Sequence, residues 1–180
     1  MKTNHHKTSE RKRKRDGTAP TVHTLRDLGR NFPSEEDPEG GSSGYALIDK
    51  IGTTLMKRIG LPGVRPDLKK GSINGTLCPA SSKRMLSHLR ASASFGCGPN
   101  KSRQRLLDAG SGQGNIALGL SAASGVPSIG IEVVQDRHEK ALLLAQEVKE
   151  LNIPCCLLEG NLDFLVSMEG ITHLFMFNVG

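Results

Sequence analysis

The sequence predicts an α/β fold built on a doubly wound, mostly parallel sheet. Three observations carry this prediction. From residue 105 onward, short apolar runs alternate with longer amphipathic segments. A glycine-rich turn, Gly110-Ser111-Gly112-Gln113-Gly114, separates the first apolar run from the helix that follows it. The next apolar run ends in an acid, Glu132, as expected of a strand-turn-helix-strand unit that binds a nucleotide.

Residues 1–44 have the composition of a disordered basic tail and linker. They are rich in charged residues, Gly, Ser and Pro, and contain too few apolar residues to form a core. Residues 1–30 hold nine Lys or Arg and three acids, and therefore the whole net charge of +6. The run Arg11-Lys12-Arg13-Lys14-Arg15 is typical of a nuclear-localisation signal or a nucleic-acid contact. A solvated tail without a partner has the same composition.

Residues 45–104 are expected to form a helical segment ahead of the sheet. Apolar residues recur at helical spacing over 45–59, and a Gly/Pro-rich stretch ends that helix. A second helix is predicted over 79–89, and a Ser/Gly/Pro-rich loop over 92–102. The second helix turns three side chains inward, which are Met85, Leu86 and Leu89.

Residues 105–180 are expected to form the sheet. After the unit around the glycine-rich turn, an amphipathic helix over 133–151 carries Leu142, Leu143, Ala145, Val148 and Leu151. Strands are predicted over 154–158 and 171–178, and the second of these is apolar enough to be buried on both faces. Since the sequence ends directly after it, we expect a sheet of order 3-2-1-4, truncated after the fourth strand and open at an apolar edge.

Composition narrows the function classes further. Aromatic residues make up 3% of the chain and Trp is absent, so stacking platforms for single-stranded nucleic acid are not expected. No apolar stretch is long enough to span a membrane, and the charged N-terminus lacks the apolar middle of a signal peptide. None of the four cysteines forms C-x-x-C, which predicts buried, reduced thiols and no metal site. The oligomeric state is not indicated.

The glycine-rich turn and its flanking acids predict a cofactor site. Glycines let a backbone approach a ligand closely, and the start of a helix offers N–H groups to an anionic group. An acid about 20 residues beyond the glycines, the place of Glu132, can accept both hydroxyls of a ribose. Dinucleotide sites prefer G-x-G-x-x-G, whereas Asn115 stands at the last position of that pattern here. The spacing favours a ligand without a pyrophosphate.

Several stretches together resemble one enzyme family. The loop Asp108-Ala109-Gly110-Ser111-Gly112-Gln113-Gly114-Asn115 is similar to the first motif of class I S-adenosylmethionine methyltransferases. Over about residues 45–180 the chain resembles the nucleosome-core histone lysine methyltransferases of the disruptor-of-telomeric-silencing type. Gly130-Ile131-Glu132 matches their G-x-E, and Gly160-Asn161-Leu162 is similar to their G-D-F. Asn178 stands at their N-N-F, and Ile73-Asn74-Gly75-Thr76-Leu77-Cys78-Pro79 is similar to their T-Y-G-E loop.

This resemblance implies a class I, Rossmann-like methyltransferase fold with S-adenosylmethionine as the cofactor. It implies that residues 108–115 form the cofactor floor, that Glu132 holds the ribose, and that Asn161 and Leu162 contact the adenine. The loop Asn74-Gly75-Thr76-Leu77 would cover the cofactor, and Asn178 would lie nearest the methyl-transfer centre.

Three positions depart from the family pattern. Asn74 replaces a Tyr and Thr76 replaces a Glu, so the covering loop lacks the carboxylate that would hold the amino-acid end of the cofactor. Asn161 replaces an Asp, and its side-chain oxygen can still accept a hydrogen bond from the adenine amine.

We therefore expect a nuclear protein-lysine methyltransferase that acts on a histone in the nucleosome core, with DNA contacted by the basic run Arg11–Arg15. Two alternatives stay open. An RNA methyltransferase or a methyltransferase for another protein has the same glycine loop. A non-catalytic nuclear module that binds only cofactor or DNA is favoured by the lost Glu and by the early end of the sheet.

Overall fold

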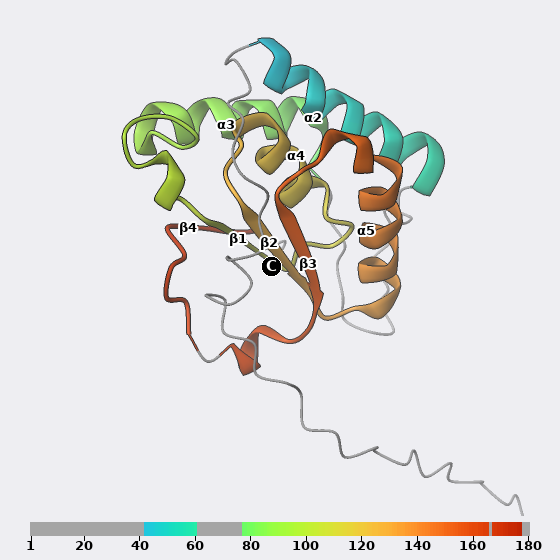
Figure 1. Ribbon diagram of the computed structural model, residues 1–180. Helices are drawn as coiled ribbons and strands as arrows, with labels where there is room; N and C mark the ends of the chain where they lie inside the picture. Colours follow the sequence, from blue (N-terminus) through green and yellow to red (C-terminus); the bar gives the residue numbers. More distant parts are fainter. Residues whose placement is uncertain (1–41, 61–76, 166, 178–180) are drawn as a thin grey trace, which may run out of the picture.

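The computed structural model describes residues 42–60, 77–165 and 167–177. Two helices precede the sheet, as expected (Figure 1). Helix α2 (Ser42–Thr54) continues into one π-helical turn, η2 (Leu55–Ile59). Helix α3 (Pro79–Ala93) begins with a proline, whose fixed φ suits the first helical turn. The connection after α3 contains a 3₁₀ turn, η3 (Lys101–Arg103).

Among the described residues, four parallel strands form one sheet. They are β1 (Leu106–Ala109), β2 (Ser128–Glu132), β3 (Cys155–Glu159) and β4 (His173–Met176). The strands lie in the order β3-β2-β1-β4, and every neighbouring pair is parallel. This order is that of the Rossmann-like nucleotide-binding folds, so the expected fold class and strand order are confirmed.

Helical connections join the first three strands. Helix α4 (Asn115–Ser124) links β1 to β2, and α5 (Gln135–Glu147) with the 3₁₀ turn η4 (Lys149–Leu151) links β2 to β3. The connection from β3 to β4 contains the 3₁₀ turn η5 (Leu162–Phe164).

Helix α4 is the most buried helix, because α2 and α3 lie across it on the side away from the sheet (Figure 1). Small side chains allow this close packing. A Cβ added to Gly44 of α2 would lie 2.7 Å from the carbonyl oxygen of Ala123 in α4, so only glycine fits there.

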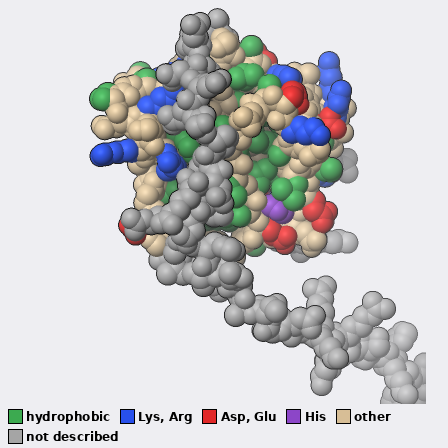
Figure 2. All heavy atoms as spheres, viewed as in Figure 1, with side chains coloured by type: hydrophobic (Ala, Val, Ile, Leu, Met, Phe, Trp, Pro, Cys, Tyr) green, Lys and Arg blue, Asp and Glu red, His purple; other side chains and the backbone are tan. Residues whose placement is uncertain are grey.

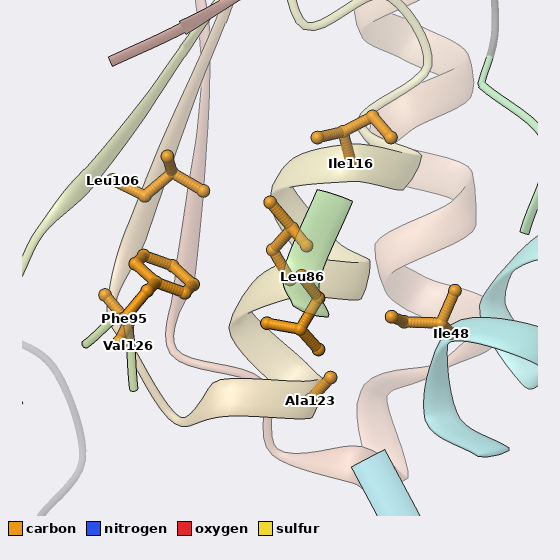
Figure 3. Close-up of a cluster of buried hydrophobic side chains, with 8 residues drawn as sticks. Ile48, Leu86, Phe95, Leu106, Ile116, Ala123 and Val126 are labelled. Carbon is orange, nitrogen blue, oxygen red and sulfur yellow. The ribbon is translucent and has the colours of Figure 1, made fainter. Parts of the chain in front are cut away.

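A cluster of eight buried side chains fills the space between these helices and the sheet (Figure 3). Its largest member, Phe95, is fully buried although it lies in the predicted loop after α3. Leu106 of β1 belongs to the same cluster, whereas its neighbour Leu107 points to the opposite face. On that face Leu107 packs with residues of β2 and of the β3–β4 connection, which are Ile129, Ile131, Leu162, Leu165 and Ile171.

Helix α5 corrects one expectation. Leu142 and Leu143, expected on its apolar side, are exposed, and the buried stripe consists of Ala141, Leu144 and Val148. These three positions are spaced i, i+3 and i+7, which places them on one side of a helix. Since three consecutive leucines cannot all face the core, the packing against α2 and β3 selects the third.

Two further expectations were wrong. Strand β4 is not buried on both faces: Leu174 and Met176 are 50% and 57% exposed, because no described element covers that face. Cys78 and Cys97 are exposed rather than buried, since they lie in the turns before and after α3. None of the described helices is long and apolar enough to cross a membrane.

Candidate functional site

A hollow opens at the carboxyl ends of β1 and β4. The chain leaves β1 toward β2 on one side, while β4 pairs on the other side, so this is the switch point where parallel α/β sheets bind ligands. Many of the predicted site residues meet here. The hollow is lined by Leu77, Asp108, Gly110, Ser111, Gly112, Gln113, Asn115, Ile116, Phe175 and Phe177.

The glycines of the loop between β1 and α4 have different roles. Gly110, Gly112 and Gly114 all have positive φ, a conformation that glycine adopts without strain. A Cβ at Gly114 would lie 3.1 Å from Ala141 and 3.2 Å from Leu157, so this glycine serves the packing of α5 and β3. A Cβ at Gly110 would meet no atom within 4 Å. Space for a ligand is therefore open beside Gly110.

The backbone N–H groups of this loop are almost all occupied. Gly110 and Ser111 both donate to the Ile131 carbonyl of β2 at 2.9 Å, and Gly114 donates to the Ser111 carbonyl at 2.8 Å. The Gly112 N–H donates to Glu132 Oε2 at 2.8 Å. These four N–H groups lie ahead of α4, and β2 and the loop itself accept them, so they are not offered to an anion.

Asp108 is the most unusual residue of the hollow. Its side chain is 2% exposed, and its Oδ2 has no hydrogen-bond partner. The pKa of this carboxyl is raised from its ordinary 3.8 to about 7, chiefly because the group is buried. A hydrogen bond from the Ala117 N–H at the start of α4 lowers the pKa by a smaller amount, and the nearby charge of Glu132 raises it slightly. A buried carboxylate oxygen without a donor is costly, and a ligand that donates hydrogen bonds would satisfy it.

Glu132 at the end of β2 holds the loop in place. It is almost fully buried, with Oε2 accepting from the Gly112 N–H and Oε1 accepting from the Val134 N–H, each at 2.8 Å. A carboxylate has about four acceptor positions, so both oxygens can still accept hydroxyl groups of a ligand.

Two amide side chains tie neighbouring segments to the hollow. Gln113 is buried and donates from Nε2 to the Gly60 carbonyl at 3.1 Å, while its Oε1 has no partner. Asn115 donates from Nδ2 to the Leu77 carbonyl at 3.2 Å. Gly60 at the end of η2 and Leu77, two residues before α3, are thereby held beside the glycine loop.

The remaining predicted residues lie in three places. Ala109 is buried at the end of β1, next to the hollow. Asn161 is exposed and caps η5, since its Oδ1 accepts from the Asp163 N–H at 3.0 Å, and Leu162 packs against Leu107 and the β2 side chains. The Gly160 N–H donates to the Glu132 carbonyl at 2.9 Å, which brings this stretch to the end of β2. Asn74, Gly75, Thr76 and Asn178 lie outside the described residues.

Three apolar residues of the hollow were not predicted. They are Ile116 of α4, Phe175 of β4 and Phe177 just beyond it. Phe175 pairs directly with Asp108 across the two strands. The sequence does contain a signal for the two aromatics. Phe175 and Phe177 are two residues apart, which places them on one face of a strand, and the carboxyl ends of parallel strands lie at the same edge of the sheet.

The site's charges select the kind of ligand. Two buried carboxyl groups and a loop with four occupied N–H groups disfavour a pyrophosphate. They suit a ligand that presents an ammonium group and hydroxyl groups beside an apolar wall. In the part of the chain that the structure describes, no three His, Cys, Asp or Glu side chains are grouped to hold a metal ion.

No protein-family model and no curated protein matches the chain. Solved structures with a similar arrangement include an RNA methyltransferase from Salinibacter ruber in complex with S-adenosyl-L-homocysteine (23% identity over 57% of this chain and 60% of that one, TM-score 0.42). A putative RNA methyltransferase from Pyrococcus horikoshii is 16% identical over 63% of this chain and 50% of that one, with a TM-score of 0.43. A putative protein-L-isoaspartate O-methyltransferase from Plasmodium falciparum is 17% identical over 83% of this chain and 68% of that one, with a TM-score of 0.46.

The chain thus spans only 60% and 50% of the lengths of the first two structures. With TM-scores between 0.42 and 0.46, these similarities do not decide the ligand or the substrate, and the residues of the hollow must do so.

Proposed function

We propose that this chain is an S-adenosylmethionine-dependent methyltransferase. The observation that carries the proposal is the unpartnered Oδ2 of Asp108, buried in the hollow between the ends of β1 and β4. S-adenosylmethionine has an ammonium group that donates hydrogen bonds, a ribose with two hydroxyls and no phosphate. A dinucleotide would bring a pyrophosphate to a site with two buried carboxyl groups.

Each residue has a definite task in this proposal. Asp108 accepts hydrogen bonds from the ammonium group, and the open side of Gly110 lets the ligand approach the backbone. Glu132 accepts the ribose hydroxyls on its remaining acceptor positions while it keeps its bonds to Gly112 and Val134. Phe175 and Phe177 form an apolar wall. The cofactor, when bound, supplies a methyl group activated by the neighbouring sulfonium.

Calorimetry on the full chain tests the proposal. We expect S-adenosylmethionine and S-adenosylhomocysteine to bind, and NAD and ATP not to bind. Asp108→Asn keeps the shape of the side chain but loses the charge, so its affinity for S-adenosylmethionine should fall by about 2 kcal/mol, roughly 30-fold. Tighter binding of NAD than of S-adenosylmethionine would overturn the assignment of the ligand.

We infer that the methyl acceptor is a lysine amine of a histone in the nucleosome core. The inference rests on the resemblance carried by residues 73–79 and by Asn178, of which residues 73–76 and Asn178 lie outside the described residues. Proximity and removal of water would dominate such a transfer. A nuclear location and DNA contact through Arg11–Arg15 belong to the same proposal. Labelled methyl transfer to nucleosomes, with free histones and RNA in parallel, tests the acceptor.

Methyl transfer to RNA is the second candidate. It is favoured by a cation-rich segment that comprises α3, η3 and their connection, where six Lys or Arg and no acid occur between residues 79 and 105. Label found in RNA alone would support this candidate. Cofactor binding without transfer to any of the three acceptors would support a non-catalytic module.

A further inference from the structure

Charge is segregated strongly within the folded part of the chain. Residues 79–105, which comprise α3, η3 and their connection, contain six Lys or Arg and no Asp or Glu. Residues 106–177 contain three Lys or Arg and nine Asp or Glu. The net charges are +6 and −6, so the zero sum over residues 79–177 conceals a basic and an acidic segment.

The basic segment runs along one flank of the molecule. Its first end is near the hollow, because Leu77 lines the hollow and α3 begins at Pro79. Its last residue, Arg105, lies at the opposite end of the sheet, where it shares backbone hydrogen bonds with Thr172 just before β4. In Figure 2, Lys and Arg side chains on the α3 flank stand largely without neighbouring acids, whereas those near α2 and α5 alternate with acids.

A shallow, open groove lies between α2 and α3 on this flank. It is lined by Tyr45, Lys83, Arg84, Ser87 and His88. The Tyr45 hydroxyl shares a hydrogen bond of 2.6 Å with Ser87 Oγ, which fixes the ring at one wall. Arg84 and His88 are exposed.

Acids from the elements packed around the groove are few. Asp49 of α2 forms an ion pair with Lys83 at 2.5 Å, and Glu150 pairs with Lys50 at 2.8 Å on the side of α5. Arg90 donates to the Ala123 carbonyl and lies over the Tyr45 ring, so it has a structural role. Arg84 and Arg103, which are exposed, are therefore the cations best placed to meet an anion, and Lys83 lines the groove beside Arg84 while it pairs with Asp49.

We propose that α3 and η3 form a binding surface for the phosphate backbone of a nucleic acid. Helix α3 has 15 residues and is about 22 Å long, which matches about six phosphates of one strand along a duplex. This surface is built from residues other than those that line the hollow, and it does not depend on the ligand of the hollow.

The surface fits a nucleic acid better than an acidic protein. Protein interfaces are anchored by buried aromatic and large apolar side chains. No exposed large hydrophobic residue occurs in the described residues between 79 and 105, whereas β4 and α5 expose several. Nucleic-acid interfaces are polar and strongly positive, which is the character of α3. Duplex DNA and RNA present the same phosphate chemistry, so the experiment must distinguish them.

Fluorescence anisotropy on the full chain tests the proposal without any cofactor. The probes are a 20-mer duplex DNA, the corresponding duplex RNA and the single-stranded RNA, between 50 and 200 mM salt. The test variant is Lys83→Gln/Arg84→Gln/Arg103→Gln. The matched control, Lys57→Gln/Lys140→Gln/Lys149→Gln, removes the same charge from η2, α5 and η4. Both keep residues 1–41, so any contribution of the tail cancels.

We expect the test variant to bind at least tenfold more weakly at 150 mM salt. Its slope of log K against log salt should fall by about 2 to 3 on a duplex, because about 0.9 is lost per phosphate contact. The control should keep the slope of the original chain, and the probe bound most tightly identifies the kind of nucleic acid. Circular dichroism melts should show both variants folded.

Three results would overturn the proposal. Equal losses in the two variants would mean that only net charge matters. Unchanged slopes of log K against log salt in both variants would mean that the tail, and not α3 and η3, makes the phosphate contacts. A poly-glutamate peptide that competes as well as the duplex would reassign the surface to acidic proteins. None of these results bears on whether S-adenosylmethionine binds, so failure here is distinguishable from failure of the proposed function.

Discussion

Replacing Asp108 by Asn should make the protein more stable at pH 8 and less able to bind its cofactor. The wild-type carboxyl is buried, one of its oxygens has no partner, and burial raises its pKa from 3.8 to about 7. At 1.36 kcal/mol for each pH unit between these values, ionised Asp108 costs the folded state about 4 kcal/mol above pH 7.

The sign of the pH dependence follows from proton binding. Between about pH 4 and pH 7 the folded protein keeps the Asp108 proton, which the unfolded chain has lost. The folded state then binds more protons, so stability falls as the pH rises. This contribution is fully present below pH 3.8 and is lost by about pH 7. Asn does not titrate. Its Oδ1 can still accept from the Ala117 N–H, but its Nδ2 then replaces the unpartnered Oδ2 and is buried without an acceptor, at a cost of about 1–3 kcal/mol.

Urea unfolding followed by circular dichroism at pH 4.5, 6 and 8 measures the effect. We expect Asp108→Asn to be about 1–3 kcal/mol more stable than wild type at pH 8 and less stable than wild type at pH 4.5. Asp136→Asn, an exposed change in the first turn of α5, is the matched control and should stay within about 0.5 kcal/mol at every pH. A difference for Asp108→Asn that does not vary with pH, or a variant less stable at pH 8, would refute the reasoning.

Three further changes probe the site and the tail. Gly110→Ala should abolish S-adenosylmethionine binding in calorimetry, whereas Gly170→Ala should not; both residues have positive φ and open space at Cβ, so they share the backbone strain and differ in their place at the hollow. Glu132→Gln should weaken S-adenosylmethionine binding by about 1–3 kcal/mol, because the ribose and the Gly112 N–H lose a charged acceptor; unchanged affinity in the same calorimeter would remove Glu132 from the site. Deleting residues 1–30, which hold nine Lys or Arg, should flatten the salt dependence of DNA binding measured by anisotropy and leave cofactor affinity unchanged; a deletion with the slope of the full chain would show that the tail makes no phosphate contacts.

The sequence predicts the unit around the glycine-rich turn well because its signals are local. The apolar run before Asp108, the positive-φ glycines and the helix from Asn115 each have the residue types that their own conformation requires. The meeting of Asp108 with Glu132 also follows, since both stand at the carboxyl ends of adjacent parallel strands.

The parts that sequence reasoning missed depend on contacts between distant segments. Packing against the rest of the protein decides which side of α5 faces the core, and it buries Leu144 and exposes Leu142. Phe95 has the local composition of a surface loop, yet the space between α3 and the sheet buries it. The Ile131 carbonyl accepts two N–H groups of the glycine loop, and only the register of β1 against β2 brings it there.

These non-local hydrogen bonds explain why glycine-rich turns between a strand and a helix can serve different ligands. A loop whose N–H groups point outward binds a pyrophosphate, and a helix N-terminus strengthens that attraction. Here β2 turns the loop inward, because the Ile131 carbonyl and the Glu132 carboxylate accept its N–H groups. The buried side-chain oxygens of the hollow that have no partner are Asp108 Oδ2 and Gln113 Oε1, and both favour a donor. The choice between an anionic and a cationic ligand therefore rests on the strand beside the loop as much as on the glycines.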